Sequence, residues 1–141
     1  MMEQAEVRKR VERILENQKI GTLATVQGGK PYTRYMAFFN EGYTLYCATS
    51  GSSHKVDDIE SNHSVHILLG YNGDGVGDEY VEIEADAIVS ESPELKQQLW
   101  KDSFRAWLDG PDDPDYVVLE INPDKIYLKN VNKSDVYNVD L

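Results

Sequence analysis

The sequence predicts a mainly β fold: an antiparallel sheet rolled into a barrel, with helices packed against its outside. Six or seven segments carry the apolar and β-branched residues that are typical of strands. Short turns rich in glycine and asparagine join many of these segments, as in β-hairpins. Only two or three segments show helical periodicity, so an antiparallel sheet is favoured over a βαβ arrangement.

The first part of the chain is expected to contain one helix and three strands. Residues 3–17 carry apolar side chains at helical spacing on an otherwise charged segment, which predicts an amphipathic helix. The segments that follow are rich in β-branched and aromatic residues and are separated by glycine-containing turns. We expect strands at 20–26, 31–39 and 43–48, with turns at 27–30 and 40–42.

The rest of the chain is expected to alternate helices with longer strands. A loop of small residues at 49–53 precedes a short helix at 55–61, which carries Val56 and Ile59 on one face. Ser92 is a suitable N-cap, followed by Pro93 at the first position of a helix that runs to about Trp107. We expect strands at 65–69, 80–89, 116–121 and 125–129, loops at 71–78, 109–115 and 122–124, and a polar tail from residue 130.

Composition limits the classes of function. The 141 residues are expected to form a single domain, 1–141, in which 40% hydrophobic residues are enough for a core. A net charge of −11 argues against a nucleic acid or an anionic membrane surface as the partner. No apolar stretch is long enough to span a bilayer, and the acidic start does not resemble a secretory signal. With one cysteine, Cys47, no intrachain disulfide is possible, so we expect a cytoplasmic protein.

Positive charge gathers in one stretch of this acidic chain. Between Ile20 and Val56 the basic residues are Lys30, Arg34 and Lys55, and the only acid is Glu41. This stretch therefore carries +2, which leaves −13 for the remainder of the net −11. Such an island favours a small anionic ligand, although strands also tend to carry few charges for structural reasons alone.

Three other features are explained more simply by structure than by chemistry. Residues 72–78 resemble a calcium loop or a glycine-rich phosphate loop, but a strand follows them where either motif needs a helix. His63 and His66 lie three apart on an expected strand and therefore face opposite ways, which argues against a zinc site. Cys47 lies within an expected strand and is interpreted as a small buried hydrophobic residue. No metal site is predicted.

The segment from Arg34 to Lys55 contains the groups that a phosphate requires. Arg34 and Lys55 supply positive charge, and the start of the helix at 55–61 supplies free N–H groups and its dipole. The alternative is a flexible Ser/Gly turn beside two solvated cations. Hydroxyl groups come from Thr49, Ser50, Ser52 and Ser53.

The order and spacing of segments over most of the chain resemble a known family. The opening helix, Ile20–Thr25 and Arg34-Tyr35-Met36 are followed by a Thr-x-x-x-Ser-x-Lys loop that ends at Lys55. Late in the chain comes the run Gly110–Tyr116. Together these segments resemble the pyridoxamine 5′-phosphate oxidase-like flavin-binding split barrels, and more closely their general stress protein 26 branch.

This resemblance implies an antiparallel split β-barrel that forms a homodimer and binds flavin mononucleotide (FMN) at the subunit interface. FAD is also compatible, because an exposed phosphate accepts an extra nucleotide. The same barrel holding haem or a deazaflavin is a further alternative, although three histidines give haem little support. The resemblance places Arg34, Thr49, Ser53, His54 and Lys55 at the phosphate, Tyr35, Met36, Ala37 and Ala48 along the ring, and Tyr80 and Trp107 as further ring contacts.

One departure from the family bears on activity. The true oxidases carry a tryptophan and an Arg-Leu element near the C-terminus that engage pyridoxal phosphate, whereas residues 126–131 here offer neither. Oxidation of pyridoxamine phosphate is therefore not expected. The sequence predicts a flavin-dependent oxidoreductase, or alternatively a flavin-binding stress protein that sequesters the cofactor without turnover. It identifies no catalytic acid or base.

Overall fold

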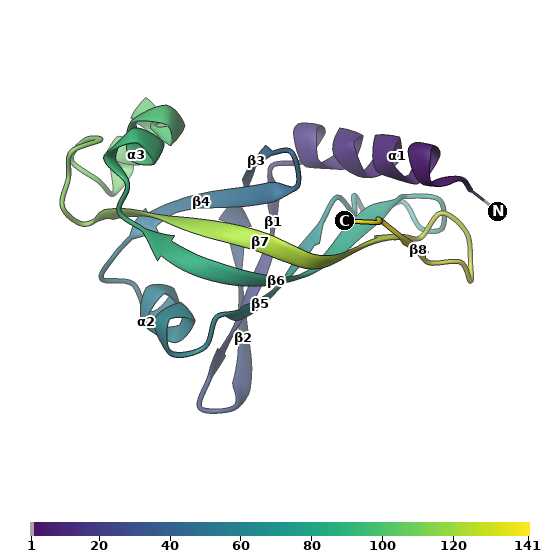
Figure 1. The fold of residues 1–141 in the computed structure, drawn as a ribbon, viewed down its shortest axis with the longest axis horizontal. Coiled ribbons are helices and arrows are strands. Elements are labelled where there is room, and N and C mark those ends of the chain that lie inside the picture. The colour runs from purple at the N-terminus through teal and green to yellow at the C-terminus, as the bar shows by residue number, and fades with distance from the viewer. Residues whose placement is uncertain (1) are drawn as a thin grey trace.

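The computed structural model describes residues 2–141, and within that range the strands form one eight-stranded antiparallel sheet (Figure 1). The path through the sheet is β2-β1-β5-β6-β7-β4-β3, with β8 paired to β7 off this path. The predicted mainly β class and antiparallel sheet are confirmed. The strands are β1 (Ile20–Gln27), β2 (Lys30–Ala37), β3 (Phe39–Glu41), β4 (Thr44–Ser50), β5 (Ser64–Leu69), β6 (Tyr80–Ser90), β7 (Tyr116–Lys129) and β8 (Tyr137–Asn138).

The sheet curls into a half-barrel whose two edges are consecutive in the chain. β2 and β3 lie at opposite ends of the path, yet only Phe38 separates them. Phe38 is buried, and its N–H donates to the carbonyl of Lys19 at 2.6 Å, which breaks the strand between Ala37 and Phe39. The single strand expected at 31–39 is therefore two strands, and its turn falls at residues 42–43 rather than 40–42.

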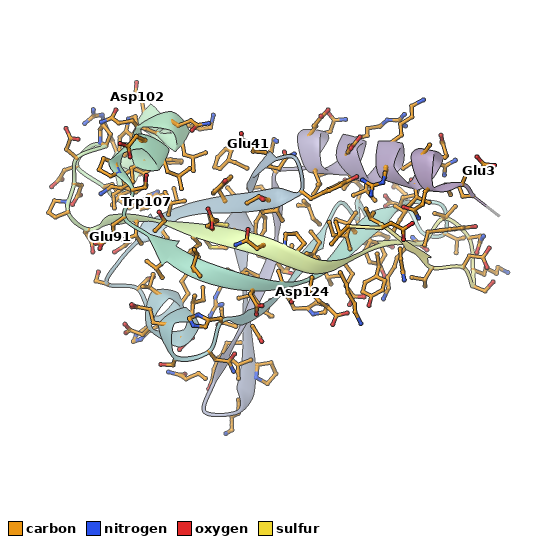
Figure 2. The ribbon with its side chains drawn as sticks, in the orientation of Figure 1. Glu3, Glu41, Glu91, Asp102, Trp107 and Asp124 are labelled. Atoms are coloured by element: carbon orange, nitrogen blue, oxygen red, sulfur yellow. The ribbon has the colours of Figure 1, made fainter. Side chains whose placement is uncertain are left out.

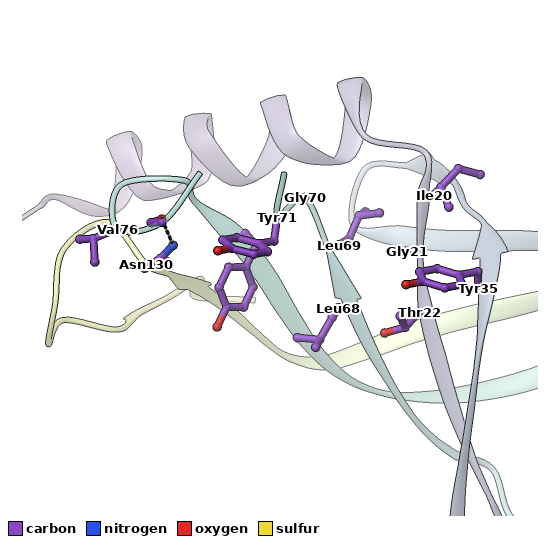
Figure 3. Close-up of a pocket in the computed structure, with 12 residues that line it drawn as sticks. Ile20, Gly21, Thr22, Tyr35, Leu68, Leu69, Gly70, Tyr71, Val76 and Asn130 are labelled. Carbon is purple, nitrogen blue, oxygen red and sulfur yellow. Dashed lines mark hydrogen bonds between the residues drawn. The ribbon is translucent and has the colours of Figure 1, made fainter. Parts of the chain in front are cut away.

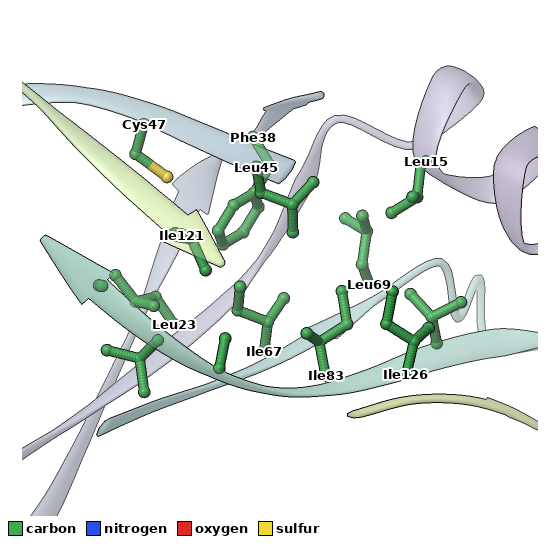
Figure 4. Close-up of a cluster of buried hydrophobic side chains, with 14 of the residues drawn as sticks. Leu15, Leu23, Phe38, Leu45, Cys47, Ile67, Leu69, Ile83, Ile121 and Ile126 are labelled. Carbon is green, nitrogen blue, oxygen red and sulfur yellow. The ribbon is translucent and has the colours of Figure 1, made fainter. Parts of the chain in front are cut away.

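Helices α1 (Gln4–Asn17) and α2 (His54–Ser61) cover the main hydrophobic core. The apolar stripe of α1, with Val7, Val11 and Leu15, is buried against the sheet as its periodicity predicts. Val56 and Ile59 of α2 join the same core. Figure 4 shows the sheet side of this core, where Leu23, Ile67, Ile83 and Ile126 from four adjacent strands meet. Among residues 2–141, the helices are too short or too polar to cross a membrane.

A second, aromatic cluster fills the end of the sheet beneath α3 (Pro93–Leu99). The helix expected to run to Trp107 ends at Leu99 and is followed by a 3₁₀ turn, η1 (Asp102–Ala106). Aromatic packing explains the break: the Trp100 ring lies edge-on to Phe104 at 5.5 Å and 5.6 Å from Tyr116. The Tyr116 hydroxyl also donates to the carbonyl of Lys96 at 2.9 Å. These tertiary contacts override local helical preference.

The end of the chain is more ordered than the sequence predicts. β7 is continuous through Asn122-Pro123-Asp124, which were expected to be a turn. Asp124 is the extra residue of a β-bulge, because Lys125 pairs with Glu84 and Pro123 with Ala85. Beyond Ile121, β7 is no longer paired with β4, so the missing N–H of Pro123 is tolerated. The polar tail contributes β8 and the buried Val139.

Candidate phosphate-binding site

Arg34 lies on the inner face of β2, where it is linked to α2 through two buried polar side chains. Its Nη1 donates to Thr25 Oγ1 at 2.8 Å and to the Leu23 carbonyl at 3.3 Å. The buried Thr25 hydroxyl in turn donates to Asp58 Oδ2 at 3.2 Å, and Arg34 Nη2 lies 4.0 Å from the same oxygen. This chain of contacts fixes Arg34 against the helix that carries Lys55.

Lys55, in the first turn of α2, points back to β4. Its Nζ donates to the buried Thr49 Oγ1 at 3.0 Å. Burial lowers the pKa of Lys55, and the positive charge of Arg34 lowers it further. The two cations thus act on each other across this site, and the buried carboxylate of Asp58 leaves the group with a net charge of +1. Such an arrangement favours an added anion.

Ser53 is the N-cap of α2, but its side chain makes no capping hydrogen bond. Within residues 2–141, its Oγ is buried and has no hydrogen-bond partner. A buried hydroxyl left unsatisfied costs about 1–3 kcal/mol, so native proteins normally provide it with a partner. An oxygen of a bound phosphate would be such a partner, next to a helix N-terminus that also attracts anions.

The other expected phosphate contacts are arranged differently. Asp115 binds two of the loop hydroxyl residues: its carboxylate accepts from Ser50 Oγ, and the Ser52 N–H donates to Asp115 Oδ1 at 3.1 Å. These two serines therefore stabilise the loop. His54 is exposed at the first residue of α2. The structure brings together Arg34, Thr49 and Lys55, and Ser53 is the N-cap of the helix that carries Lys55.

A pocket of about 640 Å³ lies on the opposite, outer face of the sheet (Figure 3). Neighbouring residues of a strand face opposite ways, so Tyr35 of β2 points to this pocket while Arg34 points inward. Tyr80, at the start of β6, lines it as well, and the Tyr71 ring lies 5.9 Å from that of Tyr80. None of its lining residues in the described chain is charged. The others are Ile20, Gly21, Thr22, Leu68, Leu69, Gly70, Gly75, Val76 and Asn130.

The remaining predicted ring contacts are distributed over the rest of the chain. Met36 is half-buried against the main core, and Ala37 ends β2. Ala48 is buried in the aromatic cluster, on the face of β4 opposite Thr49. Trp107 is 47% exposed and lies beside α3, at the end of the sheet (Figure 2). A single chain therefore does not gather the phosphate and ring residues around one ligand.

The glycine-rich loop at residues 72–78, Cys47 and His66 have structural roles. The Asp78 carboxylate accepts from the backbone N–H groups of Asn72 at 2.8 Å and Asp74 at 2.9 Å, which lower its pKa and close the glycine-rich loop. Cys47 is fully buried in the core, and burial raises the pKa of its thiol. His66 Nε2 lies 2.8 Å from Glu82. In the described residues, no three His, Cys, Asp or Glu side chains group as metal ligands.

Sequence reasoning missed three residues that shape the site: Thr25, Asp58 and Asp115. Asp58 had a detectable signal, because it lies between Val56 and Ile59 on a short helix and an acid so placed is partly turned to the core. Thr25 sits on the buried side of β1, where a hydroxyl needs a partner. Asp115 reaches the loop only through the pairing of β4 with β7, which no local pattern reveals.

Comparison with known proteins gives consistent matches. The sequence profile described as pyridoxamine 5′-phosphate oxidase matches residues 7–130. General stress protein 26 of Bacillus subtilis (strain 168) is 45% identical over 140 residues, which cover 99% of this chain and 100% of that protein. The crystal structure of General Stress Protein 26 from Bacillus anthracis str. Sterne has a TM-score of 0.83 at 37% identity, covering 95% of this chain and 99% of that chain.

A more distant structure shares the same fold. A solved F420 reductase matches with a TM-score of 0.65 at 25% identity, covering 82% of this chain and 94% of its own. Together with the closer matches, it confirms the split-barrel fold and the family resemblance inferred from the sequence.

Proposed function

Because the chain belongs to the pyridoxamine 5′-phosphate oxidase family, we propose that it binds FMN, with the cofactor phosphate held by Arg34, Ser53 and Lys55. The observation that carries this proposal is the buried Ser53 Oγ, which has no partner among the described residues, at the start of a helix whose Lys55 faces the charge of Arg34. A phosphate dianion satisfies the hydroxyl and relieves the repulsion between the two cations.

Each of these residues has a distinct part in holding the phosphate. Arg34 presents a planar fork that grips two phosphate oxygens, and its contact with Thr25 fixes the direction of that fork. Lys55 adds a compact charge, positioned by Thr49. Ser53 donates its hydroxyl, and the first N–H groups of α2 add their dipole. Once bound, FMN supplies the redox chemistry, and the protein supplies orientation and electrostatics.

A second copy of the chain is part of the proposal. The phosphate site and the uncharged pocket with Tyr35 and Tyr80 lie on opposite faces of the sheet, so one FMN cannot occupy both in one chain. A homodimer that places the pocket of one subunit against the phosphate site of its partner completes the site. Apolar side chains on this face are exposed, with Ile20 at 61%, Tyr35 at 79% and Leu68 at 43%. Obligate dimers typically bury about 2,000 Å² or more.

Two reaction types are compatible with this site, and a different observation favours each. The similarity to an F420 reductase and the open pocket support a flavin-dependent oxidoreductase. A non-catalytic flavin-binding protein is favoured by a different observation: within the described chain, no carboxylate, imidazole or amine lines the pocket, so no acid or base beyond tyrosine is at hand. Anaerobic addition of NADH or NADPH separates the two. Bleaching of the bound flavin supports the enzyme, and a flavin that stays oxidised supports the binding protein.

The test of cofactor and assembly uses the purified protein. We expect a flavin absorption spectrum, release of FMN rather than FAD on denaturation as identified by mass spectrometry, and a dimeric mass by light scattering at micromolar concentration. A protein that neither carries nor takes up a flavin would disprove the cofactor proposal. A monomeric mass in the presence of FMN would disprove the shared site.

A further inference from the structure

Lys55 places an amine nucleophile inside a site built for phosphate. Its Nζ is held by Thr49 Oγ1 at 3.0 Å, which fixes the direction of the side chain without neutralising it. Among residues 2–141, no carboxylate lies within ion-pair distance of this amine. A deprotonated Lys55 keeps an N–H for Thr49 and leaves its lone pair free for attack.

We propose that Lys55 is a site of covalent acylation by small acyl phosphates, whose phosphate group binds at Arg34 and Ser53. In this step the Lys55 Nζ attacks the carbonyl carbon and forms an amide bond. The bond between that carbon and the bridging phosphate oxygen breaks, and its electron pair leaves with inorganic phosphate. The proton lost by Nζ is taken up by the phosphate, so no oxidant or further reactant is needed.

Two properties of the site favour this reaction. Burial and the Arg34 charge lower the pKa of Lys55, which increases the share of the reactive neutral amine near neutral pH. Arg34 and the Ser53 hydroxyl hold the leaving phosphate and stabilise the charge that develops on it. Proximity thus acts together with nucleophile activation and leaving-group stabilisation.

Lys129 provides an internal comparison in the same chain. Its Nζ lies 2.6 Å from Glu82 Oε1, and this carboxylate raises the pKa of Lys129. Its amine is therefore protonated more fully than that of Lys55. Because a lower pKa leaves a larger fraction of the amine neutral at a given pH, Lys55 should react faster than Lys129.

Acylation has a consequence for the cofactor. An acylated Lys55 carries no charge and places an acyl group where the FMN phosphate binds, so acylation and FMN exclude each other. This consequence rests on the proposed function, whereas the acylation itself rests only on the phosphate site.

The experiment incubates the flavin-free protein with acetyl phosphate and follows acetylation of each lysine by mass spectrometry. We expect Lys55 to be modified first, and inorganic phosphate or FMN to protect it. p-Nitrophenyl acetate, which donates the same acyl group without a phosphate, is the comparison reagent. The rate ratio between the two reagents at Lys55 should fall roughly tenfold in Ser53→Ala and Arg34→Gln, because each removes a phosphate contact.

The outcomes are separable. If Lys55 reacts no faster than Lys129, or if the rate ratio is unchanged in both variants, the acylation proposal is wrong. An independent FMN titration of the same preparation tests the proposed function. Selective acylation without FMN binding would overturn that function alone, and FMN binding without selective acylation would overturn this inference alone.

Discussion

Replacing Lys55 by methionine should affect FMN affinity and folding stability differently, because the Lys55 charge becomes favourable only when an anion is bound nearby. Methionine keeps the length of the side chain and is well tolerated in a helix such as α2. In the flavin-free chain, burial and the Arg34 charge both disfavour the ammonium, as its lowered pKa indicates. In the proposed FMN complex, the same ammonium would face a phosphate dianion.

The expected magnitudes follow from these contacts. A charge-assisted hydrogen bond contributes roughly 1.5–3 kcal/mol, so Lys55→Met should weaken FMN binding about tenfold to a hundredfold. In the flavin-free protein, the variant loses the 3.0 Å hydrogen bond from the ammonium to Thr49, worth about 1.5–3 kcal/mol. It also loses the desolvation and repulsion that burden the ammonium. The lost hydrogen bond lowers the stability of the variant, and the relieved desolvation and repulsion raise it. The free energy of unfolding should therefore stay within about 1 kcal/mol of the parent value.

The measurements are an FMN titration by fluorescence quenching and a urea unfolding curve of the flavin-free protein. Riboflavin, which lacks the phosphate, should bind the parent poorly and respond little to the substitution. Lys30→Met is the matched control, because Lys30 lies at the β1–β2 hairpin. FMN affinity equal to that of the parent would refute the phosphate role of Lys55. A loss of several kcal/mol in the flavin-free protein would show that Lys55 holds the fold instead.

Three further predictions concern the same region. Arg34→Ala should weaken FMN binding and also lower the free energy of unfolding by about 1–3 kcal/mol, because it removes a partner of the buried Thr25–Asp58 pair; unchanged urea stability would contradict this. Between the lowered pKa of Lys55 in the folded chain and its ordinary value of 10.5, the folded chain has lost the Lys55 proton while the unfolded chain still holds it. The free energy of unfolding should therefore rise with pH in this window relative to that of Lys55→Met. Parallel curves of unfolding free energy against pH for the two proteins would count against this prediction. Cys47 should resist Ellman's reagent in the folded protein and react once unfolded, since burial raises the pKa of its thiol; prompt labelling of the native protein would show an open core.

The sequence predicts the fold well where local patterns and tertiary packing agree. The buried stripe of α1 and the hairpin of β1 with β2 follow directly from periodicity and a Gly-Gly turn. It fails where packing between distant elements decides. The helix after Pro93 breaks because Trp100 packs on Tyr116, and β7 runs through Pro123 because only one side of the strand is paired there. Neither the packing of Trp100 on Tyr116 nor the one-sided pairing of β7 at Pro123 can be recognised from the neighbouring sequence.

The candidate site likewise contains residues that local patterns reveal and residues that depend on packing between distant elements. Arg34 and Lys55 stand out as two of the three cations between Ile20 and Val56, and the family resemblance assigns them to the phosphate. Arg34 is oriented by two polar partners, Thr25 and Asp58. Their positions depend on how α2 packs against β1, which the sequence leaves open. The separation of Tyr35 from Arg34 onto opposite faces follows from strand alternation alone. The sequence therefore predicts this separation as soon as residue 34 is assigned to a strand.

In the flavin-free chain, the proposed phosphate site holds a partly buried, repelled charge and a hydroxyl that has no partner among the described residues. A leucine at Lys55 or an alanine at Ser53 would remove a repelled charge or an unsatisfied hydroxyl without disturbing the main core, to which neither side chain belongs. Stability alone does not explain why two such residues stand within three positions of each other at the start of one helix. A ligand that binds only the folded chain compensates for both costs at once, and it stabilises the folded state by an amount that grows with the ligand concentration relative to its dissociation constant. The unfavourable features of the free protein are thus what the proposed phosphate binding would relieve.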